Sequence, residues 1–232
     1  TSKVLLAEVS VMVEKYKDTP GLLMYLLGNE NNYGLFWAGA ETEDFPSDAK
    51  EILAKGEQLG RPMYRLMNSA AKAMKEVDKN HLIAICNGDV GFLDIIAEEC
   101  KDVDVYGTNM YRGKSFGDAF EVVQKTLKMP IMFTEFGADA FDAILKKEGN
   151  AGNAIGGFTF QFSDGWWKYG QTKNLNIQDD NASWSSGGYH FDYLPGSNNM
   201  NEEWFGICAK GVTNKKGVYT LKPRAAYYAL QK

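Results

Sequence analysis

GLLMYLLGNE, at residues 21–30, and PIMFTEFG, at residues 130–137, are apolar runs that each stop at a glutamate. An apolar run of about four to eight residues bounded by Gly or Pro is typical of a strand buried on both faces. In a barrel of parallel strands, the carboxyl ends of the strands open onto a cleft. We therefore expect Glu30 and Glu135 to lie at the ends of two such strands.

Two carboxylates at strand ends are the groups that glycoside hydrolysis requires. One carboxyl group attacks the anomeric carbon or activates water, and the other protonates the departing oxygen. A lone glutamate at a strand end is more often solvated or paired with a cation than catalytic. The surroundings of Glu30 favour chemistry, because Asn29, Asn31 and Asn32 supply amides suited to binding sugar hydroxyls.

Two further stretches belong with these: DVYGTNMY at residues 104–111 and GGFTFQFSDGWW at residues 156–167. Taken in order, the four stretches resemble the later strands of the retaining glycosidases that share a (β/α)8 TIM barrel, the clan that includes glycoside hydrolase family 2. The resemblance covers about residues 1–167. It implies that residues 21–30 form the acid/base strand and residues 130–137 the nucleophile strand.

The resemblance also implies a role for individual residues. Glu30 corresponds to the acid/base and Glu135 to the nucleophile. Asn29 corresponds to the asparagine that binds the sugar 2-hydroxyl. Asn109 and Tyr111 would approach the site, where Tyr111 would hydrogen-bond the nucleophile.

Tryptophan side chains are expected to stack against the bound sugar. The resemblance implies that Trp166 or Trp167, after the last barrel strand, stacks under the sugar; the alternative is that both indoles belong to the core. Trp37 lies in a long excursion, residues 33–60, of a length common in binding loops. Its ring either stacks on sugars or pins the loop to the barrel.

Apolar periodicity predicts alternating helices and strands. Helices are expected over residues 4–17, 61–77, 90–99, 118–127 and 223–230, and strands over residues 22–27, 82–86, 103–106, 131–133 and 157–162. Alternation of this kind is typical of βα units and predicts an α/β protein with a parallel sheet.

The expected fold is the C-terminal part of a (β/α)8 TIM barrel, in one glycosidase domain over residues 1–232. The alignment starts at helix three and contains strands four to eight, with the first three strands missing. An open parallel sheet exposes a hydrophobic edge, which soluble proteins avoid. We therefore expect the edge to be filled by a missing N-terminal segment of the same protein or by a second polypeptide.

Composition excludes several classes of function. The net charge of −5 argues against nucleic acid, which is bound through Lys and Arg, and no apolar run is long enough to span a membrane. Cys86, Cys100 and Cys208 are odd in number and widely spaced, which predicts buried free thiols. With only His81 and His190, we expect no metal site, and no cofactor is called for.

The sequence thus predicts a retaining β-glycosidase that hydrolyses or transglycosylates β-linked glycans. An oligosaccharide or polysaccharide of the β-glucan type fits the aromatic and amide-rich loops, whereas a uronic acid would call for a basic cluster. A carbohydrate-binding protein without turnover and an inactive truncated fragment are the alternatives. The family resemblance implies a secreted or periplasmic location.

Overall fold

The computed structural model describes residues 2–37, 49–112, 115–137, 153–165 and 204–231. The elements are α1 (Ser2–Tyr16), β1 (Met24–Leu27), α2 (Asn31–Trp37), α3 (Ala49–Val77), β2 (Leu82–Gly88), α4 (Leu93–Glu99), β3 (Val105–Met110), α5 (Ala119–Leu127), β4 (Ile131–Phe136), β5 (Ala154–Thr159), β6 (Cys208–Thr213), β7 (Tyr219–Pro223) and α7 (Ala225–Leu230).

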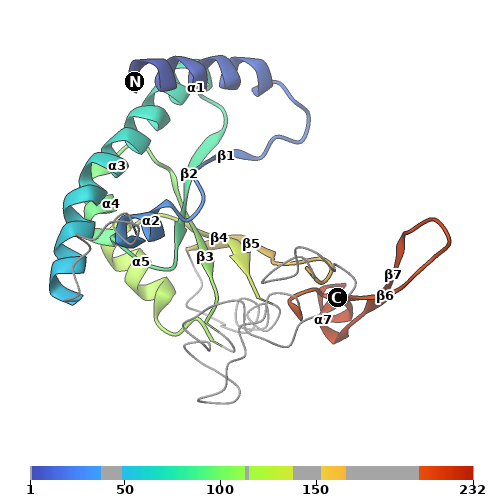
Figure 1. The fold of residues 1–232 in the computed structure, drawn as a ribbon. Helices are drawn as coiled ribbons and strands as arrows, with labels where there is room; N and C mark the ends of the chain where they lie inside the picture. The colour runs from blue at the N-terminus through green and yellow to red at the C-terminus, as the bar shows by residue number, and fades with distance from the viewer. Residues whose placement is uncertain (1, 38–48, 113–114, 138–152, 166–203, 232) are drawn as a thin grey trace. The chain divides into compact units, whose positions relative to one another are not determined.

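The main sheet has five strands in the order β1-β2-β3-β4-β5 (Figure 1). β1 runs parallel to β2, with Met24 opposite Leu82, and β2 runs parallel to β3, with Ala84 opposite Val105. Each expected strand has a counterpart in this sheet, which confirms the predicted α/β class. The described residues do not close the sheet into a barrel.

Burial explains why the central strands are continuous apolar runs. β2 is buried from Ile83 to its end, and β3 is buried throughout. Helices α3, α4 and α5 follow one another along the sheet (Figure 1), each in contact with the next. In α5, Phe120, Val123 and Leu127 recur at helical spacing and are buried, so this helix covers the sheet with its apolar face.

α3 is longer than the sequence predicts. Its expected start at residue 61 rested on Pro62, which suits a first helical turn. The helix instead begins at Ala49 and carries Pro62 in its interior. Packing explains the difference, because α3 contacts both α2 and α4. A side chain added at Gly60 would already lie 3.5 Å from Leu35 and Ile95.

Other element bounds also differ from prediction. α4 begins at Leu93 rather than residue 90, because Phe92 adopts a left-handed conformation with φ of 61°. β5 was expected over residues 157–162 and is displaced toward the N-terminus. The displacement follows from pairing, since the Ile131 N–H donates to the Asn153 carbonyl at 2.7 Å.

An antiparallel hairpin of β6 and β7 was not predicted. Its turn contains Asn214, whose side chain accepts from the Lys216 and Val218 N–H groups, and Gly217 at φ of 74°. A positive φ favours glycine, so the Gly between two β-branched runs was the available signal. α7 lies within the expected terminal helix and begins after Arg224.

The chain divides into two compact units. The first comprises Thr1–Asn109, Asp118–Thr134 and Gly152–Gly156, and the second comprises Met110–Gly117, Glu135–Ala151 and Gly157–Lys232. The second unit contains an ion pair in which the half-buried Arg224 guanidinium donates to both oxygens of the buried Asp164 carboxylate, at 2.6 and 2.9 Å. The same guanidinium donates to the Gly206 carbonyl, so it ties the segment before α7 to residues 164 and 206.

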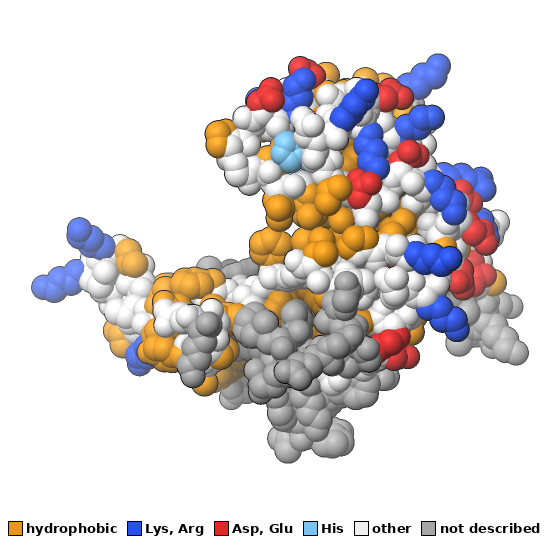
Figure 2. Space-filling view, turned by 180° about the vertical axis from the view of Figure 1, so that it is seen from behind, with side chains coloured by type: hydrophobic (Ala, Val, Ile, Leu, Met, Phe, Trp, Pro, Cys, Tyr) orange, Lys and Arg blue, Asp and Glu red, His pale blue; other side chains and the backbone are white. Residues whose placement is uncertain are grey.

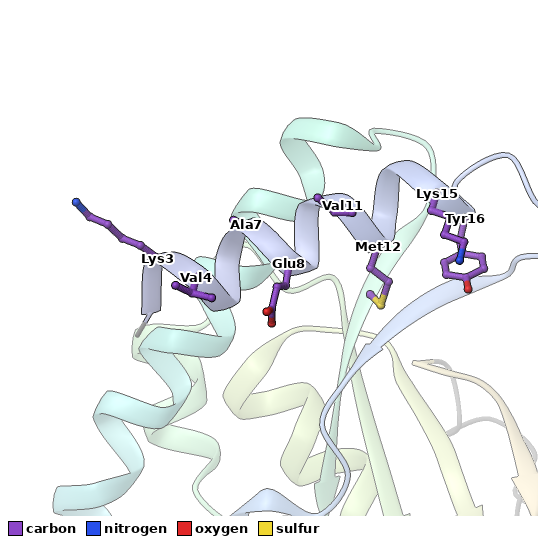
Figure 3. Close-up of a pocket in the computed structure, with 8 residues that line it drawn as sticks. All are labelled: Lys3, Val4, Ala7, Glu8, Val11, Met12, Lys15 and Tyr16. Atoms are coloured by element: carbon purple, nitrogen blue, oxygen red, sulfur yellow. The ribbon is translucent and has the colours of Figure 1, made fainter.

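Hydrophobic side chains are exposed along the β1 side of the first unit. Among the described strands, β1 pairs only with β2, and Leu26 and Leu82 are each 47% exposed. Figure 2 shows hydrophobic side chains exposed on the face of the molecule that lies behind the view of Figure 1. Figure 3 shows Val4, Met12 and Tyr16 on one side of α1, along a shallow hollow. Within the described part of the chain, no helix has the length and apolarity needed to cross a bilayer.

Candidate active site

Glu30 lies just after β1, in a tight turn against β2. Gly28 begins the turn at φ of 77°, and a side chain there would meet the Asn31 amide oxygen at 1.9 Å. Glu30 itself has a left-handed φ of 52°, and its N–H donates to the Cys86 carbonyl at 3.0 Å. Positive φ at a non-glycine residue is strained, and such strain gathers at functional sites. The turn therefore holds a half-buried carboxyl group at the carboxyl end of the sheet.

Asn109, on β3, holds the Glu30 side chain in place. Its Nδ2 donates to Glu30 Oε1 and to Asn29 Oδ1, each at 3.1 Å. Asn109 is 1% exposed, whereas Asn29 is exposed. The first unit thus brings together three of the predicted site residues.

The neighbouring asparagines have structural roles instead of free amides. The Asn31 Oδ1 accepts from the Asn29 N–H at 2.9 Å. The buried Asn32 donates to the Gly88 carbonyl and accepts from the Gly88 N–H. The amide-rich stretch after β1 is therefore used largely to fix the turn.

Sequence reasoning missed two residues of this cluster. The Thr134 hydroxyl donates to Asn109 Oδ1 at 2.6 Å, and Cys86 Sγ lies 3.1 Å from the Thr134 hydroxyl. Thr134 immediately precedes Glu135, but nothing in the sequence marks its hydroxyl as a partner of Asn109, which lies on another strand. Cys86 was predicted to be a buried thiol, without a site role.

In the second unit, Tyr111 and Glu135 are paired. The Tyr111 hydroxyl donates to Glu135 Oε2 at 2.6 Å, so the contact expected from the resemblance is present. The Tyr111 ring stacks on Phe205 with centroids 5.7 Å apart and meets Phe160 edge-on at 6.2 Å. This packing fixes the tyrosine and, through it, the orientation of a half-buried carboxyl group. Phe205 was not predicted as part of this surrounding.

Three predicted sugar-binding residues remain untested. Trp166 and Trp167 lie outside the described residues, and the side chain of Trp37, at the end of α2, is likewise not described.

The cysteines are as predicted, because Cys86, Cys100 and Cys208 are free and buried. Burial raises the pKa of the Cys100 thiol to about 12, which keeps it protonated and unreactive. Over the ranges that the structure describes, no three His, Cys, Asp or Glu side chains are grouped to hold a metal ion.

Comparison with known proteins supports the fold. No protein-family model and no curated protein matches the chain. Among solved structures, the chain is similar to the AHE enzyme from Alicyclobacillus herbarius, with a TM-score of 0.59 and 12% identity over 100% of this chain and 67% of that chain. It is also similar to a family 1 β-glucosidase from Thermotoga maritima, with a TM-score of 0.58 and 11% identity over 99% and 67%.

A β-glucuronidase from Bacteroides uniformis gives a TM-score of 0.50 and 16% identity over 99% of this chain. The chain spans only 25% of that protein. At such identities the likeness shows the fold alone: the α/β fold of this chain is similar to part of the fold of these enzymes.

Proposed function

We propose that the protein is a retaining β-glycosidase that acts on β-linked glycans by double displacement. Glu135 attacks the anomeric carbon and forms a glycosyl-enzyme. Glu30 protonates the departing oxygen and then activates the water, or the sugar acceptor, that releases the product. The mechanism requires the two carboxyl groups to lie about 5 Å apart.

This proposal rests on one observation: each glutamate accepts a hydrogen bond from a neutral side chain, and both of these side chains belong to residues 109–111. Asn109 donates to Glu30, and Tyr111 donates to Glu135. Structural carboxylates are usually paired with Lys or Arg, as Glu99 is with Arg65. A hydrogen bond from an amide or a phenol orients a carboxyl group and itself adds no charge, which suits nucleophilic attack and proton transfer.

The proposed substrate is a neutral β-glucan oligosaccharide or polysaccharide. Asn29, which is exposed beside Glu30, is the proposed partner of the sugar 2-hydroxyl, and Trp37, Trp166 and Trp167 are the proposed stacking residues. The side chains that form a cluster with Asn29 and Glu30 carry an amide, a thiol and a hydroxyl, and such groups suit a neutral sugar.

The exposed β1 edge supports a further part of the proposal, that another segment of the same protein pairs with β1. Among the described strands β1 lies at the edge of the sheet, with Leu26 47% exposed, and an edge strand is a template for an added strand.

Turnover of aryl β-glucosides, followed by proton NMR of the first sugar released, tests the function. We expect the β-anomer to appear first, because two displacements restore the starting configuration. Release of the α-anomer would contradict the retaining mechanism. Saturable binding of a β-glucan oligosaccharide without turnover would identify a binding protein, and a folded chain that does neither would be an inactive fragment.

A further inference from the structure

The Asn109 carboxamide joins four neighbours within the first unit. Its nitrogen donates to Glu30 and Asn29. Its oxygen accepts from the Thr134 hydroxyl at 2.6 Å and lies 3.4 Å from the Cys86 thiol. Because the Asn109 side chain is 1% exposed, these partners replace water around the amide.

The chemistry of the partners gives this network one direction. An amide nitrogen only donates hydrogen bonds, and Glu30 Oε1 can accept from it whether the carboxyl group is ionised or protonated on its other oxygen. The Asn109 oxygen then faces Thr134, whose hydroxyl must donate to it. Rotating the amide by half a turn would set its oxygen against the Glu30 and Asn29 oxygens and would break the hydrogen bonds to both.

Gly107, on β3, has no side chain and so leaves room for this arrangement. Cys86 on β2 pairs with Gly107 on β3, and Thr134 belongs to the next strand, β4. A side chain at Gly107 would lie 3.1 Å from the Thr134 methyl carbon and 2.3 Å from the Ile85 carbonyl. With only hydrogen at residue 107, Cys86 Sγ reaches within 3.1 Å of the Thr134 hydroxyl across the intervening strand.

We propose that Thr134 and Cys86 are positioning residues that fix the orientation of the Asn109 carboxamide and, through it, the Glu30 carboxyl group. This inference rests on the proposed function, in which Glu30 gives a proton to the leaving oxygen. Proton donation needs close alignment, and a small displacement of the donor lowers the rate. Thr134 carries more of the effect than Cys86, because a hydroxyl is a stronger hydrogen-bond donor than a thiol.

The test compares Thr134→Val, which keeps the shape but removes the hydroxyl, with Thr134→Ser, which keeps the hydroxyl. The constant to compare is kcat/KM, which reports only the first displacement. On phenyl β-glucoside, whose departure needs a proton, kcat/KM should fall about tenfold in Thr134→Val, the equivalent of one lost hydrogen bond. On dinitrophenyl β-glucoside, which departs unaided, kcat/KM should hardly change. Thr134→Ser should restore the rate on phenyl β-glucoside.

A second readout does not depend on turnover. The side-chain amide NMR resonances of Asn109, assigned by their loss in Asn109→Asp, should move in Thr134→Val and return in Thr134→Ser. Thr220→Val is the matched control, because Thr220 lies on β7 and its hydroxyl donates to the Val212 carbonyl. This control should leave the Asn109 resonances in place.

The outcomes separate the inference from the proposed function. If the wild type lacks turnover but the Asn109 resonances respond to Thr134→Val and not to Thr220→Val, the positioning stands and the glycosidase proposal fails. Equal losses on both glucosides without rescue by Thr134→Ser, or unmoved Asn109 resonances, would overturn the inference. If Thr134→Val does not fold, Cys86→Ala supplies the same comparison, with a smaller loss expected.

Discussion

Two polar clusters flank β1 in the first unit, and each contains a carboxyl group. The two carboxyl groups differ in burial and in hydrogen-bond partners. At the start of β1, the Asp78 carboxylate is 4% exposed and accepts from the Tyr25 hydroxyl at 2.9 Å and the Asn80 N–H at 2.8 Å. His81 Nδ1 lies 2.7 Å from the same carboxylate. Beyond the other end of β1, Glu30 is half-buried and held by an amide.

The different surroundings of Asp78 and Glu30 fit different roles: stability for Asp78 and, in the proposed function, catalysis for Glu30. A buried carboxylate surrounded by donors is a fixed anchor, and in barrels the amino ends of the strands serve stability. In the proposed function, the half-buried Glu30 at the carboxyl end, which accepts from Asn109, faces the substrate. Substitutions at the two ends should therefore change different measured quantities.

The largest effect is expected from Glu135→Ala, which removes the proposed nucleophile. Turnover of aryl β-glucosides should fall on the order of 10⁴-fold or more. Azide should restore the rate and give a glucosyl azide of inverted configuration, because the anion attacks the face that the carboxylate vacated. Glu76→Ala, at an exposed position on α3, is the matched control and should leave the rate unchanged.

Glu30→Ala should have the next largest effect, and one that depends on the leaving group. Loss of the general acid should lower kcat by about 10²- to 10⁴-fold on phenyl β-glucoside. Dinitrophenyl β-glucoside should be cleaved with much less loss, since its leaving group needs little protonation. The reverse pattern, with Glu30→Ala rescued by azide to the inverted product, would exchange the two roles.

Asp78→Asn should affect stability and not chemistry. Weakening hydrogen bonds to a buried charged group should lower the free energy of unfolding by about 2 kcal/mol, measured by urea denaturation. The folded variant should keep the wild-type kcat. A loss of kcat with unchanged stability would show that the Asp78 cluster affects catalysis, which would contradict the distinction between the two clusters.

The same cluster predicts a pH dependence of stability. Burial acts to raise the pKa of Asp78, but hydrogen bonds from Asn80, His81 and Tyr25 outweigh it and lower that pKa from 3.8 to about 2. The carboxylate therefore stabilises the fold fully above pH 3.8, and this contribution is lost as the pH falls toward 2. Melting temperatures should fall less steeply over this range in Asp78→Asn than in wild type.

The smallest effect is expected from Leu26→Lys, between the two clusters on β1. A lysine on an edge strand opposes pairing with another strand, so self-association measured by sedimentation should decrease. Activity should not change, because Leu26 belongs to neither cluster. Unchanged self-association would show that the exposed β1 edge does not drive it.

The sequence predicted the features that depend on residues close together in the chain better than those that depend on contacts between distant segments. Buried strands such as β2 and β4 are continuous apolar runs, so their positions follow from the sequence, as do the turn at Gly28 and the two glutamates. The start of α3 was wrong because packing on α2 and α4 overrides the local signal of Pro62. Cys86 and Thr134 were missed since they meet across β3, and contact between nonadjacent strands has no local signature.

The most direct test of the central claim is covalent trapping of the nucleophile. The reagent is a glucoside with a dinitrophenyl leaving group, in which fluorine replaces the hydroxyl next to the anomeric carbon so that the glycosyl-enzyme accumulates. Peptide mass spectrometry should find the fluoroglucosyl label on Glu135, on one residue per chain, with none in Glu135→Ala. Turnover of glucosides with the label on another residue, or with no label at all, would contradict the account.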